Sequence, residues 1–201
     1  FSIERSSIDF GYVPNSITPE MTVQLTNQSD DEVSLNSYST DNDQFSINTF
    51  LPVSVNPDEQ IDIVFSFAPT NSGTSSGVIT VDISGVPGGT SAEFNVTGYN
   101  IIYTEGIINV PETAPTIQSA IDVATDGNTV LVSAGIYYEN INNNSKGIVI
   151  KSADGPEDTI IDGSNIDTAV HIECFAVLEG FTIRNGNYTY GGGIATYGSC
   201  S

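Results

Sequence analysis

The feature that most constrains this chain is a set of short apolar segments that recur in its second half. Their sequences are Val-Leu-Val, Ile-Val-Ile, Val-His-Ile and Ile-Ala-Thr, beginning at positions 130, 148, 170 and 194. The steps between them are 18, 22 and 24 residues. A nearly constant step of this size is typical of a solenoid, in which each coil of the chain stacks on the one before.

A second series of strand-like segments runs beside the first, at 138–141, 159–163 and 181–186. Two interleaved series with similar steps predict a parallel β-helix, whose interior is filled by inward side chains stacked on their equivalents in the next coil. We expect this region to span residues 107–201.

The first half of the chain has a different pattern. Short stretches of alternating polar and apolar residues, separated by turn residues, run from Ser2 to about Gly98. The strongest lies at 61–67, where every second residue is Ile or Phe. Strands of this length, recurring about every 8–12 residues, indicate a β-sandwich. The predicted fold class is therefore all-β, with an Ig-like β-sandwich over residues 1–100 followed by the β-helix.

One segment, 115–124, shows helical spacing. Its apolar residues Ile117, Ala120, Ile121 and Ala124 fall on one helical face, and Thr116 is positioned to cap the first turn. Asp-Gly at 126–127 ends the segment. We therefore expect a helix here, directly before the repeating strands.

Five motifs follow one another in the first hundred residues: IDFG at 8–11, VQLTN at 23–27, NPDEQ at 56–60, FAPTNSG at 67–73 and VTG at 96–98. In this order they resemble the Hydin-like immunoglobulin-like domains, also called ASH or choice-of-anchor D type domains. The resemblance implies a spacer or interaction module, and it implies no catalysis.

The second half carries further motifs: TIQSAID at 116–122, DGNTVLV at 126–132, GIYYENI at 135–141, IIDG at 160–163, GFTIRNG at 180–186 and GGGI at 191–194. They resemble right-handed parallel β-helix proteins of the pectin-lyase-like superfamily. The resemblance implies that the helix caps one end of the coil stack. Related solenoids have many more coils, so we expect Ser201 to be a truncation point in a longer protein.

Charge excludes two classes of partner. The chain has 4 basic and 25 acidic residues, a formal net charge of −21. Such a field repels nucleic acid and anionic membrane surfaces. No apolar run approaches the ~20 residues that span a bilayer, so we expect no membrane insertion in this segment. The acidic, Lys-poor composition favours an extracellular or cell-surface setting, and a chain that starts at Phe1 is expected to be a mature or excised segment.

An exposed ladder of Lys151, His171 and Glu173 is a candidate binding site. Aligning the apolar triplets pairs Ile150 with Ile172, which places Lys151 one coil away from Glu173. A base, an acid and a cation on one exposed face would suit general acid–base chemistry. The alternative is a cross-strand charge pair with a solvated histidine.

A second candidate is a calcium site made of Asp154, Glu157, Asp158 and Asp162. Polysaccharide lyases on the resembled scaffold use acidic Ca²⁺ ligands and a basic residue, and Ca²⁺ needs 6–8 oxygen ligands. The alternative is that these are turn residues and solvated acids. We expect no other cofactor.

The two cysteines, Cys174 and Cys200, are 26 residues apart, close to one coil. They could stack on adjacent coils and form a disulfide in an oxidising compartment, or they could remain buried, inert thiols. Both alternatives stay open.

The sequence favours a non-catalytic fragment of a secreted or cell-surface protein of bacterial type. In this hypothesis an Ig-like spacer precedes a β-helix that binds polysaccharide or cell-surface glycan, or serves adhesion. The alternative is part of a polysaccharide lyase or glycosidase whose active site lies in other coils, and a third possibility is a purely structural spacer. Whether the whole protein is an enzyme stays open, and we predict no catalytic residue in this segment.

Overall fold

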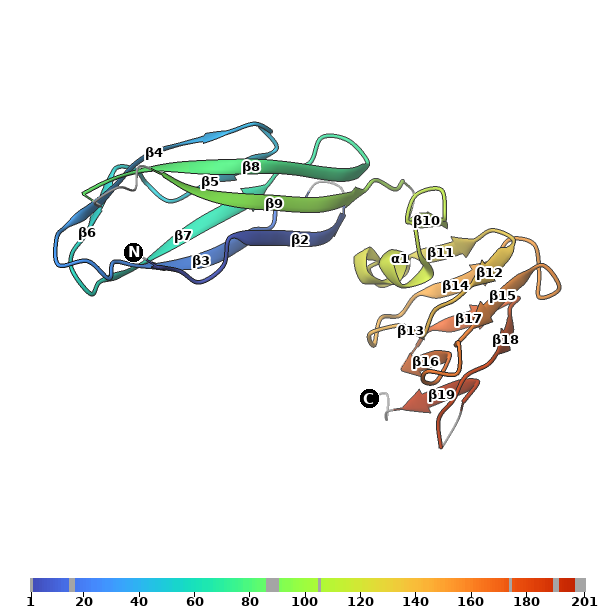
Figure 1. Ribbon diagram of the computed structural model, residues 1–201. Coiled ribbons are helices and arrows are strands. Elements are labelled where there is room, and N and C mark those ends of the chain that lie inside the picture. The colour runs from blue at the N-terminus through green and yellow to red at the C-terminus, as the bar shows by residue number, and fades with distance from the viewer. Residues whose placement is uncertain are drawn as a thin grey trace. The chain divides into compact units, whose positions relative to one another are not determined.

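The computed structural model describes residues 2–14, 17–85, 91–104, 106–173, 175–189 and 192–197. The chain divides into two compact units, Phe1–Asn100 and Ile101–Ser201, drawn in Figure 1. Nearly all regular structure is β-strand, and the helix in the described part of the chain is α1 (Ile117–Val123). No helix among the described residues has the length and apolar character that crossing a membrane requires.

The first unit is an Ig-like sandwich of two sheets. The strands of the smaller sheet, in spatial order, are β1 (Ser2–Ile3), β3 (Glu20–Thr26), β7 (Gln60–Phe67) and β5 (Phe45–Ile47). Those of the larger sheet are β2 (Ser7–Pro14), β9 (Ser91–Ile101), β8 (Gly73–Ser84), β4 (Val33–Thr40) and β6 (Val53–Val55). Neighbouring strands such as β3–β7 and β8–β9 pair antiparallel. The β-sandwich predicted for this half is therefore confirmed.

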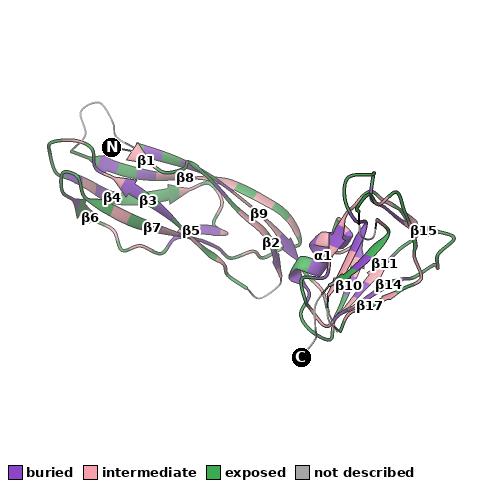
Figure 2. Ribbon diagram, turned by 90° about the horizontal axis from the view of Figure 1, so that it is seen from below, coloured by how far each residue is buried: buried purple, intermediate pink, exposed green. Residues whose placement is uncertain are grey.

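The core of this unit comes from the alternation seen in the sequence. Buried positions recur along each strand in Figure 2, and inward side chains of both sheets form one cluster. The Phe45 and Phe67 rings stack with centroids 4.7 Å apart. A Cβ atom at Gly98 would lie 2.5 Å from the Phe67 ring, so glycine is required there for close packing.

The second unit is a β-solenoid of about four turns with three parallel sheets. The first sheet consists of β10 (Ile107–Val110), β11 (Thr129–Val132), β14 (Val149–Ser152) and β17 (Val177–Glu179). The second consists of β12 (Gly135–Tyr137), β15 (Thr159–Asp162) and β18 (Thr182–Arg184). The third consists of β13 (Ile141–Asn142), β16 (Val170–Glu173) and β19 (Ile194–Tyr197).

The predicted alignment of the apolar triplets is wrong in one respect. The triplets at 130 and 148 belong to the first sheet, whereas those at 170 and 194 belong to the third. In the first sheet the successive coil steps are 22, 20 and 28 residues. Ile150 therefore pairs with Leu178, not with Ile172. The coil from β14 to β17 is 28 residues long, so the triplet at 170 falls within it, in β16 of the third sheet. An apolar triplet looks the same in the sequence in whichever sheet it lies.

Stacked side chains fill the solenoid interior. Along the first sheet Ile108, Val130 and Ile150 are fully buried and in register, and Leu178 continues the column. Their neighbours in the chain point outward, as period-two alternation requires. Ile161 in the second sheet and Val170 in the third are also fully buried.

Side chains of its own first turn and Glu139 of the next coil hold the beginning of α1. The Thr116 hydroxyl accepts from the Ser119 N–H at 3.0 Å, and the Ser119 hydroxyl accepts from the Thr116 N–H at 3.1 Å. The Glu139 carboxylate accepts from the N–H groups of Ile117 and Gln118 at 3.0 and 2.9 Å. These contacts satisfy N–H groups that the first turn of a helix leaves unpaired.

The end of α1 is held in a complementary way. The Lys146 ammonium donates to the carbonyl groups of Ile121 and Asp122, both at 2.7 Å. Burial lowers the pKa of Lys146, while the nearby carboxylates of Asp122 and Asp126 act against this shift. An anion at one end and a cation at the other match the helix dipole, and α1 contacts β10, β11 and β13.

We predict that Ile150→Ala destabilises the solenoid unit by about 2–5 kcal/mol, because it opens a cavity in the inward column. Val149→Ala, one residue away on the outer face, is the matched control and should cost far less. Hydrogen exchange of the backbone amides in β11 and β14 measures the loss of stability in this part of the solenoid. Equal losses of stability in Ile150→Ala and Val149→Ala would contradict the assignment of Ile150 to the interior.

Candidate functional site

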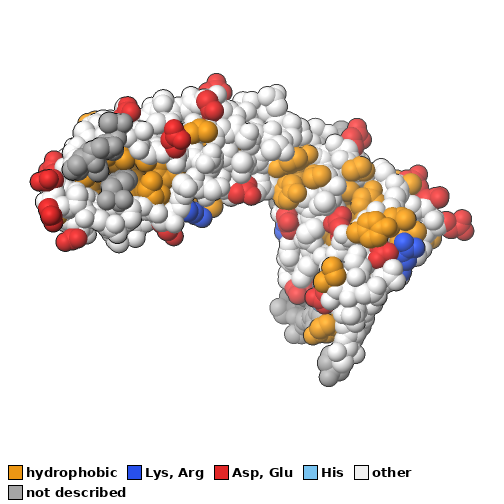
Figure 3. Space-filling view, in the orientation of Figure 1, with side chains coloured by type: hydrophobic (Ala, Val, Ile, Leu, Met, Phe, Trp, Pro, Cys, Tyr) orange, Lys and Arg blue, Asp and Glu red, His pale blue; other side chains and the backbone are white. Residues whose placement is uncertain are grey.

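The outer face of the first solenoid sheet carries two columns of aligned side chains. The first column consists of Ile107, Thr129, Val149 and Val177. The second consists of Asn109, Leu131, Lys151 and Glu179. Figure 3 shows hydrophobic side chains gathered over β11 and β14, beside a basic group. Parallel, in-register pairing thus turns isolated outward residues into a continuous surface.

A hollow of about 280 Å³ opens at the β10 end of this face. It is lined by Ile102, Tyr103, Thr104, Ile107, Asn109, Thr113 and Leu131. Ile102 and Ile107 are 40% and 39% exposed, so the hollow offers apolar surface to solvent. The Tyr103 hydroxyl is directed away to the Val123 carbonyl at 3.4 Å.

Most of the exposed surface of this hollow is polar. Thr104, Asn109 and Thr113 contribute two hydroxyls and one amide to the lining. The Asn109 carbonyl accepts from the N–H groups of Thr113 and Ala114 at 2.8 and 3.0 Å, which fixes the loop after β10. Among the described residues no hydrogen bond engages the Asn109 side-chain amide, so that amide is available to a ligand.

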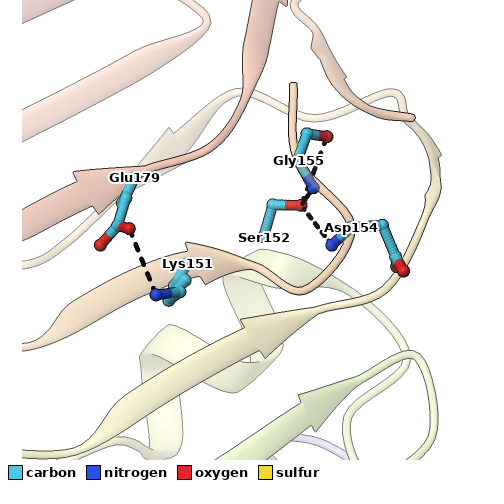
Figure 4. A network of polar contacts seen from close by, with 5 residues as sticks. All are labelled: Lys151, Ser152, Asp154, Gly155 and Glu179. Carbon is cyan, nitrogen blue, oxygen red and sulfur yellow. Dashed lines mark hydrogen bonds and ion pairs between the residues drawn. The ribbon is translucent and has the colours of Figure 1, made fainter. Parts of the chain in front are cut away.

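Lys151 lies beside Glu179 on this face, with Nζ and Oε1 3.2 Å apart (Figure 4). The predicted neighbour was Glu173, and this is corrected by the pairing of β14 with β17. The two side chains are 46% and 59% exposed, and such a pair contributes about 1 kcal/mol or less. Figure 4 also shows the turn after β14, where the Ser152 hydroxyl accepts from the N–H groups of Asp154 and Gly155.

His171 and Glu173, the other members of the predicted ladder, lie in β16 of the third sheet. His171 pairs with Asn142 and Ala195 on the neighbouring coils. The Glu173 carboxylate accepts from the Ser145 hydroxyl, and its backbone N–H donates to Asn143 Oδ1 at 2.7 Å. The base, the acid and the cation are therefore not brought together, because Lys151 belongs to a different sheet.

The four predicted calcium ligands have different surroundings. Asp154 Oδ2 accepts from the Ala134 N–H at 2.8 Å, while Glu157 and Asp158 are exposed in the turn before β15. Asp162 is only 3% exposed and faces β18. Within the described residues, no group of three or more His, Cys, Asp or Glu side chains is arranged to hold a metal ion. Cys174 and Cys200 lie outside the described residues.

Asp162 instead forms a polar cluster that joins two coils. Its Oδ2 accepts from Arg184 Nε at 2.7 Å and from the Asn185 amide at 3.0 Å, and its Oδ1 accepts from the Ser164 N–H at 3.0 Å. The hydrogen bond from Arg184, followed by that from Ser164, lowers the pKa of Asp162 below its ordinary 3.8. This arrangement explains why an acid tolerates burial at this position.

The sequence does not predict the hollow beside β10, because residues 101–106 lie between the two predicted regions, 1–100 and 107–201. The available signal was the apolar pair Ile102 and Tyr103 in a segment without strand alternation. A connecting segment that carries exposed apolar residues is unusual, since loops are mostly polar.

Comparisons with known proteins address the first unit. The family model described as "Transmembrane protein 131-like N-terminal" matches residues 1–82. Similar solved structures include the human CEP192 ASH/PapD-like domain, PapD-like domain 7, at 14% identity and TM-score 0.43, covering 51% of this chain and 85% of that one. Caenorhabditis elegans SSP-19, an MSP-domain-like protein, matches at 10% identity and TM-score 0.40, covering 49% and 99%. The Vibrio cholerae VesB protease matches at 12% identity and TM-score 0.42, covering 49% and 31%. No curated protein matched the chain.

We predict that Asp162→Asn lowers the stability of the solenoid unit near neutral pH, and that the difference from the unchanged protein shrinks in acid. Because the folded-state pKa is lowered, the carboxylate stabilises the fold fully above its ordinary pKa of 3.8. That contribution is lost as the pH falls through the folded value. Urea unfolding at about pH 6 and about pH 2.5 measures the difference.

The matched control is Asp158→Asn, which removes an exposed acid four residues earlier. It should leave the pH dependence nearly unchanged. A constant difference between Asp162→Asn and the unchanged protein across this pH range would contradict a role for the Asp162 carboxylate.

Proposed function

We propose that this chain is a non-catalytic interaction module of a secreted or cell-surface protein, and that its solenoid binds carbohydrate. The observation that carries the proposal is the hollow beside β10, where exposed apolar side chains lie among hydroxyl and amide groups. Hydroxyl and amide groups can hydrogen-bond the hydroxyls of a ligand, and the apolar side chains can contact its C–H groups. A sugar ring has this same combination of C–H faces and hydroxyl edges.

Residues that line the hollow have distinct roles in the proposed carbohydrate site. Ile107 and Leu131 offer apolar contacts to the C–H groups of a sugar, and the Asn109 amide supplies both a donor and an acceptor. No Lys or Arg lines the hollow, and the net charge is −21. Acidic polysaccharides would be repelled, so the proposed ligand is a neutral carbohydrate.

The aligned outer columns supply a second support. A polysaccharide repeats along its length, and a solenoid repeats outward positions at each coil. A long ligand could therefore extend from the hollow along β11, β14 and β17. Separation of Lys151 from His171 and Glu173 favours binding over acid–base catalysis, because Lys151 lies in the first sheet and the other two residues lie in the third.

We further infer that the solenoid is a right-handed β-helix of the pectin-lyase-like type, spanning residues 107–201, and that α1 caps one end of the coil stack. Contacts of α1 with β10, β11 and β13 support a capping role. The Ig-like unit, over residues 1–100, would serve as spacer. The acidic, Lys-poor composition supports an extracellular or cell-surface location.

We predict that the 201-residue chain is retarded in native gels that contain a neutral polysaccharide, such as a mannan, a β-glucan or a galactomannan. Asn109→Ala should weaken the retardation about two- to tenfold, the effect of one lost hydrogen bond. Ile166→Ala is the control, because Ile166 is 74% exposed and lies outside the hollow.

Absence of retardation by every neutral polysaccharide tested would count against carbohydrate binding. Retardation that Asn109→Ala leaves intact would place the binding elsewhere on the chain and contradict the assignment of the hollow.

A further inference from the structure

A separate hollow lies on the outer face of the larger sheet of the Ig-like unit. Its volume is about 260 Å³, and its lining comes from β2, β8 and β9. The lining residues are Asp9, Gly11, Tyr12, Thr74, Thr97, Gly98 and Tyr99. Gly11 has no side chain to fill the hollow, because a Cβ atom there would have nothing within 4 Å, and the walls carry two aromatic rings and one carboxylate.

The sequence of β2 places Asp9 and Tyr12 on the same face. Ile8 and Val13 are buried, so strict alternation between them would not put both Asp9 and Tyr12 outside. Gly11, with φ of +64°, provides the irregular step, as glycine does in β-bulges. Asp9 Oδ1 accepts from the Gly11 N–H at 3.0 Å, which fixes the carboxylate beside the hollow.

The two aromatic rings form a defined pair. Ring centroids of Tyr12 and Tyr99 are 5.4 Å apart, and the ring planes are inclined by 62°. Tyr12 is 42% exposed, so part of its ring is open to solvent. Within the described residues neither the Tyr hydroxyls nor Asp9 Oδ2 is engaged in a hydrogen bond. Figure 3 shows hydrophobic side chains at the C-terminal ends of β2 and β9.

A second hollow of about 280 Å³ adjoins the first. It is lined by Asp41, Ser76, Gly77, Val78, Asn95, Val96 and Thr97, and Thr97 is common to both. Asp41 Oδ1 accepts from the Val78 N–H at 2.7 Å. An acid therefore lies in each hollow, and neither lining contains a Lys or Arg. The two hollows together follow the outward residues of β9.

We propose that this face binds an extended basic segment of a partner protein, and that a Lys or Arg side chain of the partner occupies the hollow formed by Tyr12, Tyr99 and Asp9. Aromatic faces attract ammonium and guanidinium groups, and a carboxylate adds charge complementarity. The net charge of −21 steers cations toward the chain. The basic segment would continue along β9 toward Asp41. This inference does not depend on carbohydrate binding by the solenoid.

The test is an NMR titration of the 201-residue chain in about 20 mM salt, where charge attraction is weakly screened. The probes are the N-acetyl methylamides of arginine and lysine, with those of citrulline and norleucine as neutral counterparts. We expect saturable shifts at the amides of residues 97–99 with the two cationic probes. The neutral probes should bind at least about fivefold more weakly.

Variants separate the ring from the charge. Tyr12→Leu keeps apolar bulk but removes the aromatic face, and Asp9→Asn keeps an acceptor for the Gly11 N–H but removes the charge. Each variant should bind the cationic probes at least about threefold more weakly than the unchanged chain does. Tyr38→Leu is the matched control, because Tyr38 is a similarly exposed tyrosine of the same unit outside both hollows.

Three outcomes would overturn the proposal. One is the absence of saturable shifts with both cationic probes, and another is equal binding of norleucine and lysine. The third is a response at residues 97–99 to neutral oligosaccharides but not to cations, which would assign this face to carbohydrate. Asn109→Ala should leave the cation titration unchanged, so failure here is distinguishable from failure of the solenoid site.

Discussion

The structure of the second unit depends on one constraint, the in-register hydrogen bonding of each strand to its equivalent in the next coil. This pairing aligns Ile108, Val130 and Ile150 in the interior. The same pairing aligns the outward columns and forms the face on which the hollow opens. It also brings side chains of the following coil to both ends of α1. Slipping one strand by a single residue would turn its whole inward set toward solvent.

Positive charge is scarce in this chain, which has 4 basic and 25 acidic residues. Each of the three cations of the solenoid is engaged: Lys146 on carbonyl groups of α1, Lys151 with Glu179, and Arg184 with Asp162. Two of them join successive coils through acids, and the third holds the helix. The remaining acids give the chain its strong negative charge, on which both proposals about its partners depend. We propose neutral ligands for the solenoid hollow and cationic ligands for the hollow between Tyr12 and Tyr99.

Local features were predictable because they depend on neighbouring residues. Alternation at 61–67 gave a strand, and helical spacing with Thr116 as cap gave the segment that contains α1. Register was not predictable, because apolar triplets in different sheets look alike and the coil that starts at Val149 takes 28 residues. The Lys151 ladder was misassigned for this reason. The hollow beside β10 and the hollow between Tyr12 and Tyr99 each combine residues that are far apart in the sequence. Strand pairing brings these residues together, so no local sequence pattern predicts either hollow.

The central claim is the stacking order of the first solenoid sheet, and methyl NOE spectroscopy of the isotopically labelled chain tests it most directly. Strands about 4.8 Å apart bring inward methyl groups of adjacent coils within NOE range. The stacking predicts cross-peaks between Val130 and Ile150 and between Ile150 and Leu178. Cross-peaks from Ile150 to Ile172 in place of Leu178 would contradict it.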